Sequence, residues 1–260
     1  FKDKNYPILI DQEGGRINRV RNIFNVDKFT GEYFGNLFLK DKKKFNNNYK
    51  IFINKTSHLL KQIGVNINTV PVLDIRKKRS SQIIGDRSFS SNPKIVNKIG
   101  NFCINFFHKN NIGTVIKHIP GHGLAKVDSH KLTPIVKEKI SYLKKNDFST
   151  FRNKKSFFAM TAHIIYSDID KIYPATQSKK IVKMIRKNIK FDNILMSDDI
   201  SMKSLKYSIQ KNTIRAFTAG CNLVLHCNGN FKEMLIVANN SPIVDRFIVK
   251  KTSQFYKILS

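Results

Sequence analysis

The sequence predicts an α/β fold built on a parallel sheet, and it favours a (β/α)8 TIM-type barrel. Short apolar runs alternate with amphipathic stretches, the runs are too continuous for half-exposed strands, and each is followed by a titratable side chain. Active sites of (β/α)8 barrels form at the carboxyl ends of the strands, where these side chains fall. The alternative is an open doubly wound sheet, but no G-x-G-x-x-G or G-x-x-x-x-G-K-[ST] motif follows any strand.

Six strands are expected, at residues 7–10, 67–73, 114–117, 157–161, 193–196 and 223–225. The polar residues that follow them are Asp11-Gln12-Glu13, Asp74, Lys117-His118, His163, Asp198-Asp199 and His226. No internal repeat or linker interrupts this order, so we expect a single domain over residues 1–260.

Amphipathic helices are expected between the strands. The clearest has Ile95, Ile99, Phe102 and Phe106 on one face and begins at Asn92-Pro93. Another carries Leu59, Leu60 and Ile63 and ends at Gly64, and a third carries Ile181, Met184 and Ile185. The charged, Asn-rich segment 40–50 is expected to be a solvated helix end or loop.

The net charge of +29 bears on possible partners. It is compatible with a nucleic-acid partner. However, the 47 lysines and arginines are spread along the chain and form no basic stripe with interleaved aromatics. Lysine, asparagine and isoleucine are abundant throughout, which indicates compositional bias. We therefore expect no specific nucleic-acid partner.

Three cysteines, Cys103, Cys221 and Cys227, show neither a disulfide framework nor CxxC spacing. This pattern is typical of a reducing compartment and gives no thiol zinc site. No run of about 18 apolar residues is present, so no membrane span is expected. We expect a cytoplasmic protein.

A loop rich in histidine follows the strand at 114–117. Lys117-His118-Ile119-Pro120-Gly121-His122-Gly123 is followed by Asp128-Ser129-His130, and the Pro-Gly pair prevents a regular helix. The i, i+4 spacing of His118 and His122 could indicate zinc, but the breakers remove the helical geometry that this needs. Asp128 and His130 are spaced so that a carboxylate can orient an imidazole. A surface turn is the plainer interpretation of that pair.

Carboxylates cluster after two other strands. Asp11-Gln12-Glu13-Gly14-Gly15 could approach a ligand closely or form a solvated turn. In Ser197-Asp198-Asp199, two adjacent aspartates repel each other unless something uses them, although one could cap the next helix. A Ser-His-Asp hydrolase is disfavoured because no G-x-S-x-G elbow is present.

Taken in order, these motifs resemble the bacterial cytoplasmic β-N-acetylglucosaminidases of glycoside hydrolase family 3. The matching stretches are Ile10 to Arg16, Pro71 to Ile75, Ile84 to Phe89, Lys117 to Gly123 with Asp128-Ser129-His130, Ala162 to Tyr166, Ser197 to Met202 and Ala219 to Cys221. The histidine loop with its Asp-Ser-His tail is the most specific of them.

The resemblance implies a retaining β-N-acetylhexosaminidase that acts on N-acetylglucosaminyl-anhydro-muramyl peptides in peptidoglycan recycling. It assigns Asp198 as nucleophile, His130 as acid/base and Asp128 as its partner. It assigns sugar binding to Asp11, Arg19, Arg87, Lys117 and His118. It implies a monomer with a small-molecule substrate, no cofactor, no metal and no membrane.

The sequence departs from the family pattern at three places. Asn193 replaces a usual glycine, and Thr69 replaces a common aromatic. The family barrel also has two strands before the one at 7–10, so the resemblance implies a catalytic domain that lacks its first two strands, with residues 7–10 and 223–225 as edge strands. Two alternatives follow: a non-catalytic remnant that binds nucleic acid or glycan, and a β-glucosidase of the same family, which would take its acid/base from elsewhere.

We expect the positive charge to give only weak, non-specific binding to DNA, because dispersed lysines attract phosphates without reading bases. A fluorescence-anisotropy titration with duplex DNA should show binding that disappears as salt rises from about 50 to about 200 mM. Sequence-specific, sub-micromolar binding at physiological salt would contradict this.

Overall fold

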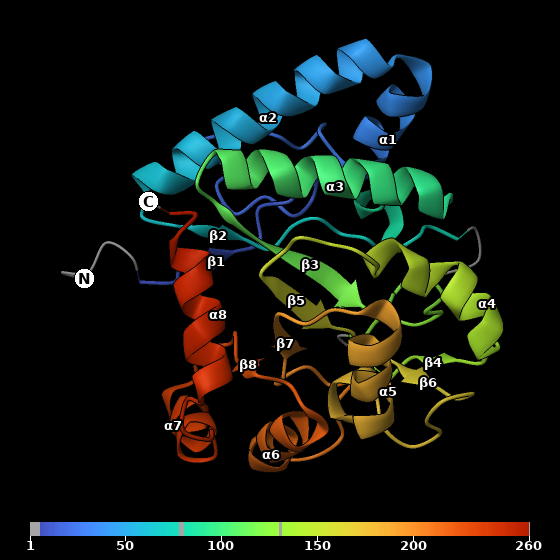
Figure 1. Cartoon of the computed structure of the whole chain (residues 1–260), viewed down its shortest axis with the longest axis vertical. Coiled ribbons are helices and arrows are strands. Elements are labelled where there is room, and N and C mark those ends of the chain that lie inside the picture. The colour runs from blue at the N-terminus through green and yellow to red at the C-terminus, as the bar shows by residue number, and fades with distance from the viewer. Residues whose placement is uncertain (1–5, 78–80, 130–131, 260) are drawn as a thin grey trace.

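The computed structural model describes residues 6–77, 81–129 and 132–259 and shows a curled parallel sheet enclosed by helices (Figure 1). The sheet runs in the order β1-β2-β3-β5-β7-β8, and every pairing within it is parallel. A separate parallel pair, β4 and β6, lies beside it. The arrangement is a half-barrel, so the parallel α/β class is confirmed and a closed (β/α)8 barrel is not.

The strands are β1 (Leu9–Ile10), β2 (Ile67–Asn68), β3 (Gly113–Ile119), β4 (Ile135–Val136), β5 (Phe158–Thr161), β6 (Ile165–Tyr166), β7 (Ile194–Asp199) and β8 (Leu223–Leu225). The helices are α1 (Gly31–Lys40), α2 (Lys42–Gln62), α3 (Pro93–Lys109), α4 (Ile140–Lys145), α5 (Lys179–Met184), α6 (Ile209–Ala219), α7 (Phe231–Asn239) and α8 (Arg246–Tyr256). Short helical turns are η1 (Gly85–Arg87), η2 (Asp147–Phe151), η3 (Ala175–Gln177) and η4 (Ile185–Ile189).

All six predicted strands are present in the main sheet. The second strand, β2, is shorter than expected. Its regular pairing stops at Asn68, and in residues 69–73 the structure has one isolated bridge, between Val72 and Lys117. Pro71 contributes to this shortening, since it has no N–H to donate to a neighbouring strand.

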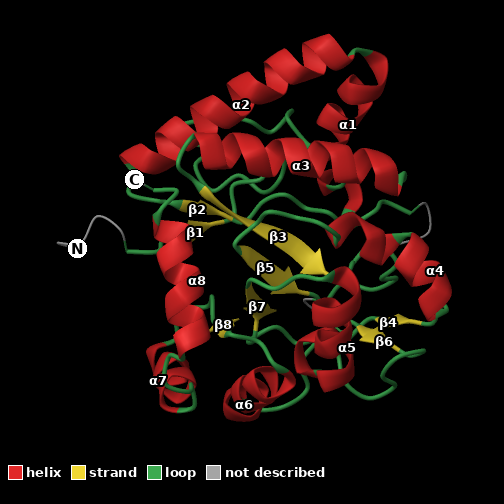
Figure 2. Cartoon of the chain, viewed as in Figure 1, coloured by secondary structure: helices red, strands yellow, loops and turns green. Residues whose placement is uncertain are grey.

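The predicted helices are also present, with two corrections (Figure 2). The buried face of α3 is turned relative to the predicted stripe: Ile99 is on it, whereas Phe102 is partly buried and meets Phe45 of α2 at 5.3 Å between ring centroids. Segment 40–50 is mostly the packed start of α2, with Asp41 as its N-cap and Phe45 and Tyr49 buried. Packing of α2 over α3 explains both differences.

The two outer strands of the described sheet, β1 and β8, do not close it into a barrel. Among the described residues, β1 pairs with β2 and β8 pairs with β7, but β1 and β8 do not pair with each other. Their side chains Leu9, Leu223 and Leu225 pack instead against an apolar cluster that includes Phe255 at the end of α8. In Figure 1, α8 runs on the side of the sheet where β1 and β8 lie.

Phe255 is the centre of this lower cluster. Its ring is fully buried and lies 5.2 Å from that of Phe158, between ring centroids. A Cβ atom added at Gly113, the first residue of β3, would come within 2.5 Å of the Phe255 ring, so only glycine permits the approach. These contacts lie at the amino ends of β3 and β5, opposite the polar site described below. Over the described ranges, no helix combines the length and apolar character that a membrane crossing requires.

Phe255→Ala should destabilise the fold by about 3–5 kcal/mol, because it leaves a cavity where α8 closes the lower end of the sheet. Chemical denaturation monitored by circular dichroism measures this free energy of unfolding. Ile243→Ala is the matched control, since Ile243 is 96% exposed and its truncation should change stability by less than about 0.5 kcal/mol. Equal midpoints for the two variants would contradict the assigned role of Phe255.

Candidate active site

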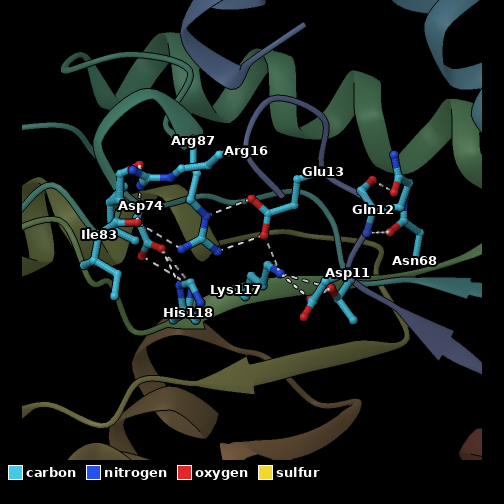
Figure 3. A network of polar contacts seen from close by, with 12 residues as sticks. Asp11, Gln12, Glu13, Arg16, Asn68, Asp74, Ile83, Arg87, Lys117 and His118 are labelled. Atoms are coloured by element: carbon cyan, nitrogen blue, oxygen red, sulfur yellow. Dashed lines mark hydrogen bonds and ion pairs between the residues drawn. The ribbon is translucent and has the colours of Figure 1, made fainter. Parts of the chain in front are cut away.

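A buried lysine lies at the centre of a charged network at the carboxyl ends of the strands (Figure 3). The Lys117 side chain of β3 is only 2% exposed. Its Nζ lies 2.8 Å from Oδ1 of Asp11 and 2.6 Å from Oε1 of Glu13, and it also donates to the Thr69 hydroxyl at 3.0 Å. Burial of an ammonium group is tolerated because two carboxylates neutralise it.

Arg87, at the end of η1, holds the other side of Glu13. Its Nε and Nη2 each donate to one carboxylate oxygen at 2.8 Å, which is the bidentate geometry that arginine favours. Burial would raise the pKa of Glu13, but the charges of Arg87 and Lys117 lower it to about 2. Glu13 therefore remains ionised and keeps both cations in place.

Asp11 is more exposed than Glu13, with 40% of its side chain accessible. Burial would raise its pKa, but the charge of Lys117 and the hydrogen bonds from Lys117 and Thr69 lower it well below the usual range. Arg19, 58% exposed, lies 3.8 Å from the other Asp11 oxygen. An ionised, partly exposed carboxylate beside an exposed guanidinium is suited to hydrogen-bonding the hydroxyl groups of a sugar.

Asp74 organises the histidine loop. Its Oδ2 contacts Nδ1 of His118 at 2.7 Å, and its Oδ1 accepts the backbone N–H of His122 at 2.6 Å. Burial would raise the pKa of Asp74, but His118 lowers it. With Asp74 on Nδ1, the Nε2 atom of His118 is left to face a ligand.

Asp198 stands at the end of β7 and is half-buried. Burial raises its pKa, but His118, His163 and Lys117 and the N–H of Asp199 together hold it below the ordinary value. The N–H of Asp199 donates to Asp198 Oδ1 at 2.8 Å. Asp198 is therefore ionised and electrostatically linked to the Lys117 network.

Asp199 has a different role from its neighbour. Its carboxylate accepts from the backbone N–H and hydroxyl of Ser201, at 3.0 and 2.7 Å, and from the N–H of Cys227 at 3.2 Å. It holds a turn rather than the next helix, because α6 begins later and is capped by Ser208. His163 joins the support by contacting the Asp199 carbonyl through Nε2 at 3.0 Å.

The structure brings Asp11, Arg19, Arg87, Lys117, His118 and Asp198 into one electrostatically connected group. Asp128 lies half-buried on the histidine loop beside Ser129. His130 falls outside the described residues, so its pairing with Asp128 stays a prediction. Within the described ranges, no group of three or more histidine, cysteine, aspartate or glutamate residues is arranged to hold a metal ion.

The sequence placed Glu13 and Asp74 at strand ends without assigning either a role, and it did not place Thr69 in the site, although all three hold its charged residues. The positions of Glu13 and Asp74 after predicted strands marked them in the same way as Asp11 and Asp198, but the cation that each one holds was not visible in the sequence. Thr69 gave no such signal, since it was noted only as a departure from an aromatic. Its hydroxyl donates to Asp11 and accepts from Lys117, and neither phenylalanine nor tryptophan could do both.

This arrangement can support substitution at a glycosyl centre, given an acid. The half-buried Asp198 carboxylate lies within electrostatic reach of Lys117 and His118, and these groups can fix a polar substrate. Such positioning turns an encounter into an effectively intramolecular attack.

Comparison with known proteins gives a consistent family. The model of the "Glycosyl hydrolase family 3 N terminal domain" matches residues 6–253. The β-hexosaminidase of Methylobacillus flagellatus is 28% identical over 89% of this chain and 67% of its own length, and that of Tolumonas auensis 30% identical over 90% and 70%. The structure of NagZ from Neisseria gonorrhoeae in complex with N-trifluoroacetyl-D-glucosamine is 25% identical, covers 96% of this chain and 73% of that one, and superposes with a TM-score of 0.85.

The chain spans 64–72% of the length of the first three curated β-hexosaminidases that it matches.

Asp147 is a buried carboxylate that the group above does not use. It is 2% exposed, and neither of its oxygens has a hydrogen-bond partner among the described residues. It lies under the histidine loop, where a Cβ added at Gly121 or Gly123 would approach it within 2.8 or 3.1 Å. Burial is the main reason that its pKa is raised to about 7.

Asp147→Asn should stabilise the protein increasingly as pH rises. The carboxyl of Asp147 loses its proton near pH 3.9 in the unfolded chain and near pH 7 in the folded chain. The free energy of unfolding of the wild type therefore falls by roughly 1 kcal/mol per pH unit between those two values. Urea unfolding of wild type and variant at pH 5, 6, 7 and 8 measures the difference. Asp192→Asn is the control because its side chain is 85% exposed. A wild-type-to-variant difference that is constant with pH would refute the prediction.

Proposed function

The chain belongs to glycosyl hydrolase family 3, among relatives that are bacterial β-hexosaminidases, and from this premise we propose that it is a retaining exo-β-N-acetylglucosaminidase. The observation that carries the proposal is the ionised, half-buried Asp198 facing the Lys117 network. The first-cited solved relative was crystallised with an N-acylated glucosamine, which supports this substrate class. Ionised, paired side chains also favour an enzyme over a non-catalytic remnant.

Asp198 is the proposed nucleophile. Its carboxylate attacks the anomeric carbon, and the bond from that carbon to the leaving oxygen breaks to give a covalent glycosyl-enzyme. A low pKa keeps Asp198 deprotonated, and the Asp199 N–H holds one oxygen at 2.8 Å. The hydrogen bonds that occupy Asp199 exclude it from the same role.

His130 is the proposed acid/base, with Asp128 as its partner. It donates a proton to the leaving oxygen in the first step and accepts one from water in the second. An imidazole titrates near pH 6.5 when unperturbed, so one side chain can serve both steps near neutral pH. Retaining glycosidases usually use a second carboxylate for this work, and here a histidine replaces it.

The charged network is the proposed sugar platform. Asp11 and Arg19 have the exposure needed to reach sugar hydroxyls, at 40% and 58% of the side chain. Arg87 and His118 are held by Glu13 and Asp74, so their remaining donors point to fixed positions. The three donors of Lys117 already face Asp11, Glu13 and Thr69, so Lys117 would bind a sugar hydroxyl by exchanging one of these contacts. We propose that these donors bind the ring hydroxyls and the N-acetyl group.

We further propose cytoplasmic action on N-acetylglucosaminyl-anhydro-muramyl peptides during peptidoglycan recycling. The likeness to bacterial β-hexosaminidases and the three free cysteines support this setting. The decisive experiment is incubation of purified protein with an aryl N-acetyl-β-glucosaminide while proton NMR follows the sugar released. Retention predicts that the β anomer is released first. Absence of turnover, or release of the α anomer first, would overturn the proposal.

Asp198→Ala should reduce turnover by roughly a thousandfold or more, because no nucleophile remains. Added azide should restore product as an α-glycosyl azide, since a small anion can enter the vacated position. Asp199→Asn should retain much more activity. Wild-type rates in Asp198→Ala, or a larger loss in Asp199→Asn, would remove Asp198 from the mechanism.

A further inference from the structure

We infer that His122 is a positioning residue that holds Ser129, the residue before the proposed acid/base, through a side-chain contact. The inference rests on the proposed function, because that assigns acid/base catalysis to the residue after Ser129. His122 itself is not assigned to contact substrate.

The contact joins two parts of the histidine loop that are seven residues apart. His122 Nε2 lies 3.1 Å from Ser129 Oγ, and both side chains are buried, at 3% and 4% exposure. Burial is the main reason that the pKa of His122 is lowered to about 4, so the ring is neutral near pH 7. A neutral imidazole and a hydroxyl can pair without separating charge in this buried setting.

The backbone of His122 is fixed independently. Its N–H donates to Asp74 Oδ1 at 2.6 Å, while Asp74 Oδ2 contacts His118. The rings of His118 and His122 are 5.4 Å apart at an interplanar angle of 63°. Asp74 therefore gives the sugar-binding His118 and the tail-contacting His122 one common anchor.

The described residues that follow the Asp-Ser-His tail make contacts of their own. The N–H of Leu132 donates to the carbonyl of Asp128 at 3.0 Å, and the Thr133 hydroxyl donates to the Ser204 carbonyl at 2.6 Å. Ser204 follows β7, which carries Asp198. Ser129 therefore connects the histidine loop to His122 and Asp74, and Thr133 connects a later described segment to Ser204 beyond the strand that carries Asp198.

A positioning role predicts a selective loss. Substrates with poor leaving groups need a proton from the acid, whereas an activated aryl group such as dinitrophenolate departs without one. Misplacing the tail should therefore slow cleavage of a GlcNAc disaccharide about 10- to 100-fold, and formation of the glycosyl-enzyme from the dinitrophenyl glycoside less than about threefold. Loss of general stability would affect both substrates alike.

The test compares His122→Ala, Ser129→Ala and their double variant with wild type on both substrates. The two single variants should show the same selective loss, and the double variant should be no worse, because each substitution removes the same contact between His122 and Ser129. His122→Gln, whose amide can reach Ser129, should recover part of the disaccharide rate. Ser156→Ala is the matched control, since it removes a buried serine hydroxyl bonded to Thr114 and Phe158 carbonyls at the other end of the sheet.

Equal losses on both substrates, additive effects, or a loss in Ser156→Ala of the same selectivity would overturn the inference. Hydrogen exchange gives a second readout that does not need turnover: backbone amides of residues 128–133 should exchange faster in His122→Ala than in Ser156→Ala. If the wild type hydrolyses no glycoside, the proposed function fails, while unchanged exchange in His122→Ala refutes the contact itself.

Discussion

Compensation of the buried Lys117 charge is the constraint on which the site depends. An ammonium group at 2% exposure is stable only beside anions, and here Asp11 and Glu13 supply them from the segment after β1. Glu13 then requires Arg87, whose loop lies far along the chain. One charge requirement therefore fixes the relative positions of β1, β3 and η1. The same pairing keeps Asp11 ionised while leaving it accessible to a ligand.

The half-barrel keeps the charged network and the apolar cluster around Phe255 at opposite ends of its strands. Charged groups gather at the carboxyl ends of the strands, whereas Phe255 and its neighbours fill the amino ends. Because Phe255 of α8 joins that apolar cluster, side chains of both outer strands are partly covered, although β1 and β8 do not pair among the described residues. Helix α7 contributes no buried side chain, so the fold gains little from it by comparison with α8.

Much of the fold could be predicted because its signals are local. Apolar runs marked all six strands, and Asn92-Pro93 marked the start of α3, where the Asn92 side chain accepts from the Lys94 N–H. The turned face of α3 could not be read from periodicity, since it depends on where α2 packs. In the site, strand-end charges were visible in the sequence, but the partner of each was not. Glu13 joins Arg87 across 74 positions, a distance that no local pattern encodes.

The site also divides its proposed chemistry between two kinds of support. Asp198 lies on β7, an inner strand of the sheet, and pairing of β7 with β5 on one side and β8 on the other restricts its position. The proposed acid/base follows Ser129 in the sequence, and Ser129 lies on a loop where a side-chain contact with His122 holds it rather than a ladder of backbone hydrogen bonds. A loop can adapt to two successive proton transfers, but only if its ends are tied. Asp74 meets that need from beneath the loop, since its one carboxylate holds His118 and His122 together. Asp74 is thus as necessary to the proposed mechanism as the residues that would touch the sugar, although it is fully buried.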